Sequence, residues 1–171
     1  SAQVKLRLNR TEMTGTKLRI SISGLTGGHS GVEIDKGRGN ANVLMSRILR
    51  DAAKKAPIFI VSVEGGKKDN AIPRECLSEI IVEADKAEAV KAAVEETANE
   101  IREEFATSDA DFNVTTELSD GCSVKAVTKE DSAKAVALIQ SLPNGIMRMS
   151  QDIDNLVETS LNLGIISLDE S

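Results

Sequence analysis

The sequence is poor in aromatic residues, and this shortage excludes several classes of binding protein. Its 171 residues include three phenylalanines and no tryptophan or tyrosine. Proteins that stack bases or sugars against side chains rely on aromatic faces. The formal net charge is −6, whereas nucleic acids and anionic membranes attract basic surfaces. We therefore expect neither nucleic acid nor a membrane among the partners.

Cysteines and long apolar runs are also scarce. Cys76 and Cys122 are the only two cysteines, and they lack the Cys-x-x-Cys spacing of zinc ribbons and thioredoxin-like sites. We predict two buried, reduced thiols in a cytoplasmic protein. No apolar run approaches the roughly 20 residues that cross a bilayer. The sequence also shows no secretory signal.

The length and composition predict a single folded domain over residues 1–171. Hydrophobic residues make up 40% of the chain and charged residues 28%, which is ordinary for a soluble globular protein. A chain of this length can bury a sizeable core. Because it begins Ser1-Ala2 without a methionine, our interpretation is an excised segment of a longer protein.

The first forty residues predict a hairpin followed by a long loop. Residues 4–8 and 18–22 alternate apolar with polar side chains, and the link between them contains Gly15. This pattern is typical of a β-hairpin. Residues 24–39 hold six glycines. A loop of this length inside a compact domain is usually functional or disordered.

The rest of the chain alternates between helical and strand patterns. Apolar residues recur at helical spacing in three segments, and Asn40 or Asn42 is suited to N-cap the first helix. The predicted helices cover residues 40–56, 85–106 and 128–142. The predicted strands cover residues 58–63, 75–83, 112–118 and 157–167.

From residue 17 onward the order of elements begins β-α-β-β-α-β, which is the pattern of a ferredoxin-like split βαβ fold. We predict an α+β domain, a ferredoxin-like antiparallel sheet with helices on one face. An N-terminal hairpin and a C-terminal helix plus strand extend this unit. The other face of the sheet is then solvated or covered by another domain.

The only histidine, His29, lies in the glycine-rich loop. Glycines let the backbone turn sharply and expose the side chain that a loop carries. His29, Glu33 and Asp35 are close in sequence. A catalytic zinc needs about three ligands, and no second histidine is present, so we predict no metal site. Ser30 adjoins His29 without the pattern of a serine triad. His29 is therefore either an incidental loop residue or part of a site completed elsewhere.

Four short motifs occur in order along the chain. They are Gly-Leu-Thr-Gly-Gly-His-Ser-Gly at 24–31, Gly-Arg-Gly-Asn-Ala-Asn at 37–42, Asn-Ala-Ile-Pro-Arg-Glu at 70–75 and Val-Glu-Thr-Ser-Leu-Asn at 157–162. From about Lys17 to the C-terminus, the chain closely resembles the lid, or dimerisation, domain of bacterial aminoacyl-histidine dipeptidases. These are zinc exopeptidases related to carnosinase, and their lid is inserted into a separate catalytic domain.

The resemblance implies roles for several side chains. His29 matches the lid histidine that, in dimeric relatives, reaches the active site of the partner subunit. There it helps to hold the substrate and stabilises the tetrahedral oxyanion, as an imidazole N–H is suited to do. Asn70 matches an asparagine implicated in substrate contacts. Arg148 is a further candidate, although the family's carboxylate-binding arginine lies just past the end of this chain. Glu158 is expected to face solvent or a partner domain.

The resemblance also implies what lies outside the chain. Two divalent metal ions, expected to be zinc, and the general-base glutamate belong to the catalytic domain. The isolated domain should then be inactive. The full-length protein is expected to be a cytoplasmic homodimer that hydrolyses Xaa-His dipeptides.

A second interpretation is a ferredoxin-like regulatory module that oligomerises and senses a small ligand, as ACT-like domains do. It would explain the sheet, the helices and the acidic surface, but not the four ordered motifs. The parent reading frame separates the two interpretations. Flanking His-x-Asp and Glu-Glu motifs would indicate the dipeptidase, and an unrelated biosynthetic enzyme would indicate the regulatory module.

Overall fold

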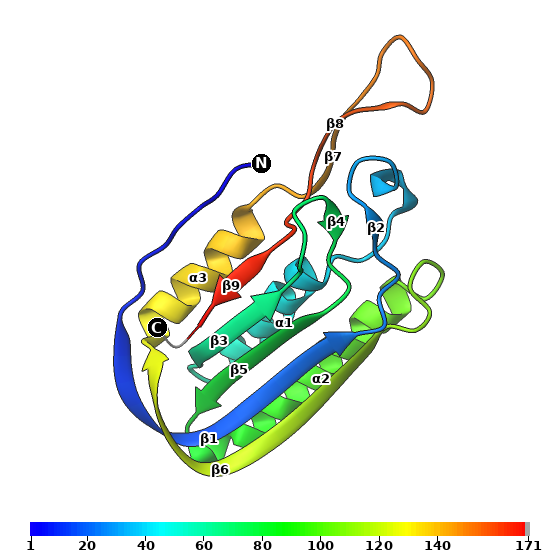
Figure 1. Cartoon of the computed structure of the whole chain (residues 1–171). Helices are drawn as coiled ribbons and strands as arrows, with labels where there is room; N and C mark the ends of the chain where they lie inside the picture. Colours follow the sequence, from blue (N-terminus) through cyan, green and yellow to red (C-terminus); the bar gives the residue numbers. More distant parts are fainter. Residues whose placement is uncertain (170–171) are drawn as a thin grey trace.

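A computed structural model describes residues 1–169 (Figure 1). In this part of the chain, five strands form an antiparallel sheet and three α-helices cover one of its faces. The sheet contains β1 (Arg10–Ser23), β3 (Phe59–Gly65), β5 (Cys76–Val82), β6 (Asn113–Val127) and β9 (Ile166–Leu168). The helices are α1 (Ala41–Lys55), α2 (Ala87–Glu104) and α3 (Lys129–Ser141). The shorter strands are β2 (Gly28–His29), β4 (Ala71–Ile72), β7 (Gly145–Met149) and β8 (Val157–Leu161), and the 3₁₀ helices are Ile34–Lys36 and Ala84–Lys86.

The strand order confirms the predicted ferredoxin-like sheet. The order is β6-β1-β5-β3-β9, and every neighbouring pair is antiparallel. Helix α1 connects β1 to β3 across β5, and α2 connects β5 to β6 across β1. These two crossovers interleave as in a split βαβ fold. The predicted C-terminal extension is also present, because α3 joins the helical layer and β9 pairs with β3.

The predicted N-terminal hairpin is wrong. Residues 1–9 form no strand, and β1 runs without a turn through the segment predicted as the hairpin link. The first half of β1 pairs with the second half of β6, and the register shifts between Gly15 and Lys17. A Cβ on Gly15 would overlap the carbonyl oxygen of Val82. The glycine therefore marks a β-bulge and a close approach within a long strand.

The predicted last strand, 157–167, is two strands with different partners. Strand β8 pairs with β7 in a hairpin separate from the sheet, whereas β9 adds to the edge of β3. Between β8 and β9, Gly164 packs against the turn that joins β3 to β4. A Cβ on Gly164 would be 2.9 Å from the Asp69 Cα. This packing ends the alternating pattern, and it depends on a contact that is distant in sequence.

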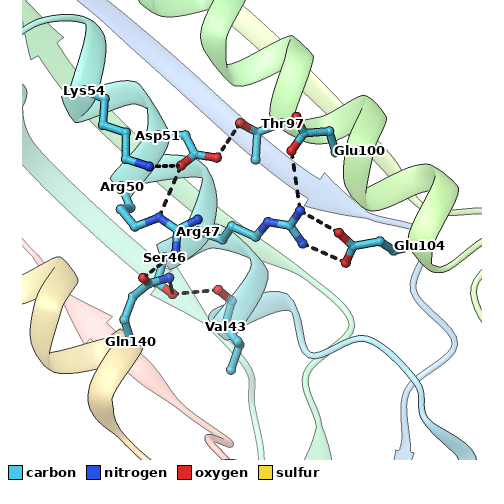
Figure 2. Close-up of polar contacts among 10 residues, drawn as sticks. All are labelled: Val43, Ser46, Arg47, Arg50, Asp51, Lys54, Thr97, Glu100, Glu104 and Gln140. Atoms are coloured by element: carbon cyan, nitrogen blue, oxygen red, sulfur yellow. Dashed lines mark hydrogen bonds and ion pairs between the residues drawn. The ribbon is translucent and has the colours of Figure 1, made fainter.

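The helical layer is held together by α1, which lies between α2 and α3. Asn40 caps α1, since its Oδ1 accepts hydrogen bonds from the backbone N–H groups of residues 42 and 43. Figure 2 shows the polar contacts between the helices. Arg47 donates two hydrogen bonds to Glu104 of α2, at 2.7 and 2.6 Å. On the other side, Gln140 of α3 donates to the Ser46 hydroxyl at 3.3 Å.

The main core lies between the sheet and the helices. It includes Leu18, Ile20, Met45, Ile48, Ile80 and Val94, which are each at most 1% exposed. A smaller cluster of Val61, Ile81 and Ala126 lies on the other face. The first half of β1 and the second half of β6 curl in this region (Figure 1). Their side chains Met13 and Val124 pack against the smaller cluster, so the open face is partly covered by the chain itself.

Both cysteines are free thiols, but only one is buried as predicted. Cys76 is buried in the main core, and burial raises the pKa of its thiol to about 12. Cys122 is half-buried on the other face of the sheet. Among the described residues, no helix is long and apolar enough to cross a membrane.

Candidate functional site

A two-stranded ribbon brings together His29 and Asn70, which are 41 positions apart in the sequence. Strand β2 pairs with β4, and His29 lies opposite Ala71. One step further, the backbone N–H of Ser30 donates to the carbonyl oxygen of Asn70 at 3.0 Å. Both candidate side chains are exposed. The site therefore forms from the first and third sequence motifs.

The imidazole of His29 is held in one tautomer by its own loop. Its Nδ1 accepts hydrogen bonds from the backbone N–H groups of Gly31, at 3.0 Å, and Val32, at 3.2 Å. An imidazole nitrogen that accepts carries no proton, so these donors assign the proton of the neutral ring to Nε2. Within residues 1–169, no hydrogen bond involves Nε2. This N–H remains available to an acceptor from outside the domain.

The backbone of His29 is fixed by Glu33 and Arg38. The Glu33 carboxylate accepts the His29 backbone N–H at 2.8 Å and pairs with the Arg38 guanidinium at 3.0 Å. The hydrogen bond from His29, followed by that from Arg38, lowers the pKa of Glu33. Arg38 also donates to the Gly27 carbonyl at 2.6 Å. The sequence offers Glu33 only as a metal ligand, a role that the lone histidine argues against, and its positioning role depends on this folded loop.

The glycines of the loop are required by its tight turns. Gly27 has φ +68° and Gly28 has φ +141°, both in the region that favours glycine. A Cβ on Gly28 would also lie 2.6 Å from Arg38 Nη1 and 2.7 Å from Glu33 Oε2. The residue beside His29 must therefore be small for the Arg38–Glu33 pair to reach the backbone.

Asp109 clamps the two ends of the loop, and sequence reasoning missed it. Its Oδ1 accepts the Thr26 N–H at 2.8 Å, and its Oδ2 accepts the Gly39 N–H at 2.9 Å. Asp109 is 1% exposed. Burial by itself would raise the pKa of Asp109, but the hydrogen bonds from Thr26, Gly39 and Ser108 outweigh it, and the pKa is lowered. A single aspartate in an irregular segment carries no sequence pattern that predicts this contact.

A cluster of asparagine side chains fastens the ribbon to the β7–β8 hairpin. Asn162, just after β8, donates to the carbonyl oxygens of Asp69, at 3.3 Å, and Ala71, at 2.8 Å. These two carbonyls flank Asn70. The Nδ2 of Asn40 lies 3.2 Å from Oδ1 of both Asn162 and Asn144. The second and fourth sequence motifs therefore support the turn that carries Asn70.

Arg148 lies on the β7–β8 hairpin, apart from the other two candidates. Its Nε contacts the Glu158 carboxylate at 2.8 Å across the hairpin, and both side chains are about half exposed. In the part of the chain that the structure describes, no hydrogen bond or ion pair joins Arg148 to His29 or Asn70. The base of the β7–β8 hairpin nevertheless lies beside the β2–β4 ribbon, because Asn162 donates to the Ala71 carbonyl. A hollow of about 290 Å³ at this base is lined in part by Arg38, Asn40, Ile72, Asn144, Ile146 and Asn162, and none of the three candidate side chains lines it.

The described residues do not form a metal site. No group of three or more His, Cys, Asp or Glu side chains among residues 1–169 could hold a metal ion. A second hollow, of about 820 Å³, lies between the C-terminal half of α1 and α3 and contains none of the candidate residues. The His29 imidazole and the Asn70 amide on the ribbon can both donate hydrogen bonds to a ligand.

The chain is similar to known proteins over most of its length. Residues 20–109 match the family model described as the peptidase dimerisation domain. The chain is 34% identical over 154 residues to a cytosol non-specific dipeptidase from Escherichia coli (strain K12), covering 90% of this chain and 31% of that protein. It is similar to the crystal structure of aminoacylhistidine dipeptidase from Vibrio alginolyticus, with a TM-score of 0.89 and 30% identity. That match covers 96% of this chain and 34% of the other. The chain thus spans about a third of the length of these two relatives.

Proposed function

The chain belongs to the peptidase dimerisation domain family, and on that premise we propose that it is the lid of a homodimeric metallo-dipeptidase. The lid covers an active site that belongs to a separate catalytic domain, outside this chain. The observation that supports this most strongly is the ribbon. It presents a fixed, exposed imidazole N–H without the other groups that hydrolysis needs.

We place His29 in the active site of the partner subunit. Its Nε2–H donates to the oxygen that becomes negative when the peptide carbonyl is attacked. Such a donor is effective when its position is fixed before the reaction. The hydrogen bonds to Nδ1 and the contact from Glu33 supply that fixation. No metal is required for this role of the imidazole.

Asn70 and Arg148 are assigned to the substrate. The Asn70 side-chain amide can donate to a carbonyl or carboxylate oxygen, and the turn that carries it is held on both sides by Asn162. Arg148 would have to exchange its ion pair with Glu158 for the substrate carboxylate. We propose Xaa-His dipeptides as substrates, by similarity to the relative from Vibrio alginolyticus. The name of the relative from Escherichia coli includes the cytosol, which supports a cytoplasmic location.

The metal ions belong to the catalytic domain in this proposal. Two divalent ions, which we propose to be zinc, would be held by residues outside the chain, because the described residues offer no ligand cluster. The regulatory-module interpretation accounts for the fold but not for the family to which the chain belongs. We therefore retain the dipeptidase.

Metal removal from the full-length polypeptide tests the proposed function. We expect the purified protein to hydrolyse Xaa-His dipeptides, to lose this activity after treatment with a chelator, and to regain it when zinc is added back. The 171-residue chain alone should neither hydrolyse these dipeptides nor bind zinc, which elemental analysis would measure. Chelator-resistant hydrolysis by the full-length protein, or hydrolysis by the 171-residue chain, would contradict the proposal.

A further inference from the structure

The β7–β8 arm, residues 145–161, exposes an unusual number of apolar side chains. Ten large apolar side chains are exposed in residues 1–169, and seven of them lie between positions 146 and 165. Six belong to the arm, namely Ile146, Met147, Met149, Ile153, Leu156 and Leu161. A two-stranded hairpin by itself is only marginally stable in water. Clustered exposed apolar surface usually marks a contact with another macromolecule.

The arm and the His29 ribbon lie at the same end of the molecule. Figure 1 shows β7 and β8 extending away from the sheet, beside β2 and β4. The base of the arm is fastened there. Asn162 donates to Ala71, which is the strand partner of His29. Asn144 accepts hydrogen bonds from the Asn40 side chain and from the Leu163 backbone N–H, at 3.2 and 2.9 Å. A protein surface that binds His29 must therefore also lie next to the arm.

We propose that the apolar residues of the arm dock on the catalytic domain that receives His29. This inference rests on the proposed function. Two observations favour the catalytic domain, rather than the arm of a second copy, as the partner that binds these apolar residues. The asparagine cluster ties the arm to the ribbon, and about two thirds of the length of the two relatives lies outside the matched region. The arm then orients the domain that carries His29.

The apolar tip of the arm offers the sharpest test. Ile153 and Leu156 are 58% and 47% exposed. The turn that carries them is held by hydrogen bonds to the Ser150 hydroxyl and between backbone groups, which side-chain substitutions leave in place. We suggest the double variant Ile153→Ser/Leu156→Ser in the full-length dimer. Val4→Ser/Leu6→Ser is a matched control, because these side chains are 62% and 48% exposed and lie outside the arm.

The arm variant should lower kcat/KM by about tenfold or more, as expected when apolar anchors are lost from a contact. The control variant should retain wild-type activity. Light scattering should show that the arm variant is still a dimer, and hydrogen exchange of the arm amides should be faster than in wild type. Three results would overturn the inference: wild-type kcat/KM, unchanged exchange, or dissociation into monomers, which would assign the arm to a contact between the two lid domains rather than to the catalytic domain. If the arm variant is fully active while His29→Ala is not, this inference fails and the proposed function stands.

Discussion

Replacing His29 with alanine in the full-length dimer is expected to lower kcat by about 100- to 1,000-fold, the usual loss when one oxyanion donor is removed. The folded state should be unaffected, because the side chain is exposed and its removal opens no core cavity. Steady-state kinetics on an Xaa-His dipeptide would measure the effect, and circular dichroism and elemental analysis would verify fold and metal content.

Val32→Ala is the matched control for this substitution. Val32 lies in the same loop, is 79% exposed, and contributes only its backbone N–H to the His29 ring. The alanine variant keeps that N–H, so its kcat should remain close to wild type. His29→Asn should recover part of the lost rate only if its amide reaches the same oxygen. A near-normal kcat and KM for His29→Ala would refute the catalytic role of the loop.

Replacing Asp109 with alanine should produce the second large effect, a loss of about 3 kcal/mol in the free energy of unfolding. The variant leaves the buried Gly39 N–H and the part-buried Thr26 N–H and Ser108 hydroxyl without their acceptor. A buried orphan donor costs about 1–3 kcal/mol, and the two part-buried donors add less. Urea denaturation followed by circular dichroism suits a protein without tryptophan. Asp111→Ala, an exposed neighbour, is the control.

The pH dependence of the Asp109 variant identifies the cause of its instability. The pKa of Asp109 is lowered in the folded state. Its contribution is therefore fully present above the unfolded pKa and is lost as the pH falls through the folded pKa. The gap in stability between wild type and Asp109→Ala should narrow over that acidic range. A difference in unfolding free energy that is constant with pH, or that is below about 1 kcal/mol at neutral pH, would contradict the stabilising role of Asp109.

The sequence predicted the elements whose hydrophobic pattern is local. The strand around Ile20 alternates clearly, the strand around Ile80 ends in a short apolar run, and the helix after Asn40 has both a cap and an apolar stripe. The N-terminal hairpin failed because Gly15 is equally compatible with a turn and a bulge. The choice between them is made by the pairing with β6, about a hundred residues later. Register and glycine geometry of this kind are set by tertiary contacts.

The candidate site was likewise predictable only in part. His29 and Asn70 could be singled out from motifs, whereas their juxtaposition depends on the pairing of β2 with β4, two strands of two residues each. Elements that short carry no detectable periodicity. The Asp109 clamp and the asparagine cluster are also contacts between distant segments. They involve ordinary polar residues, which are far more often simply solvated.

Mixing two inactive forms of the full-length protein would test the central claim, that His29 acts in the active site of the partner subunit. One form carries His29→Ala, and the other has intact His29 but a catalytic domain that has lost its metal ligands. If His29 acts across the dimer, each mixed dimer has one complete site. Random reassociation of equal amounts should then restore about a quarter of wild-type activity, since half of the dimers are mixed. Activity that remains at the sum of the two residual values, although mixed dimers form, would show that His29 does not act across the dimer.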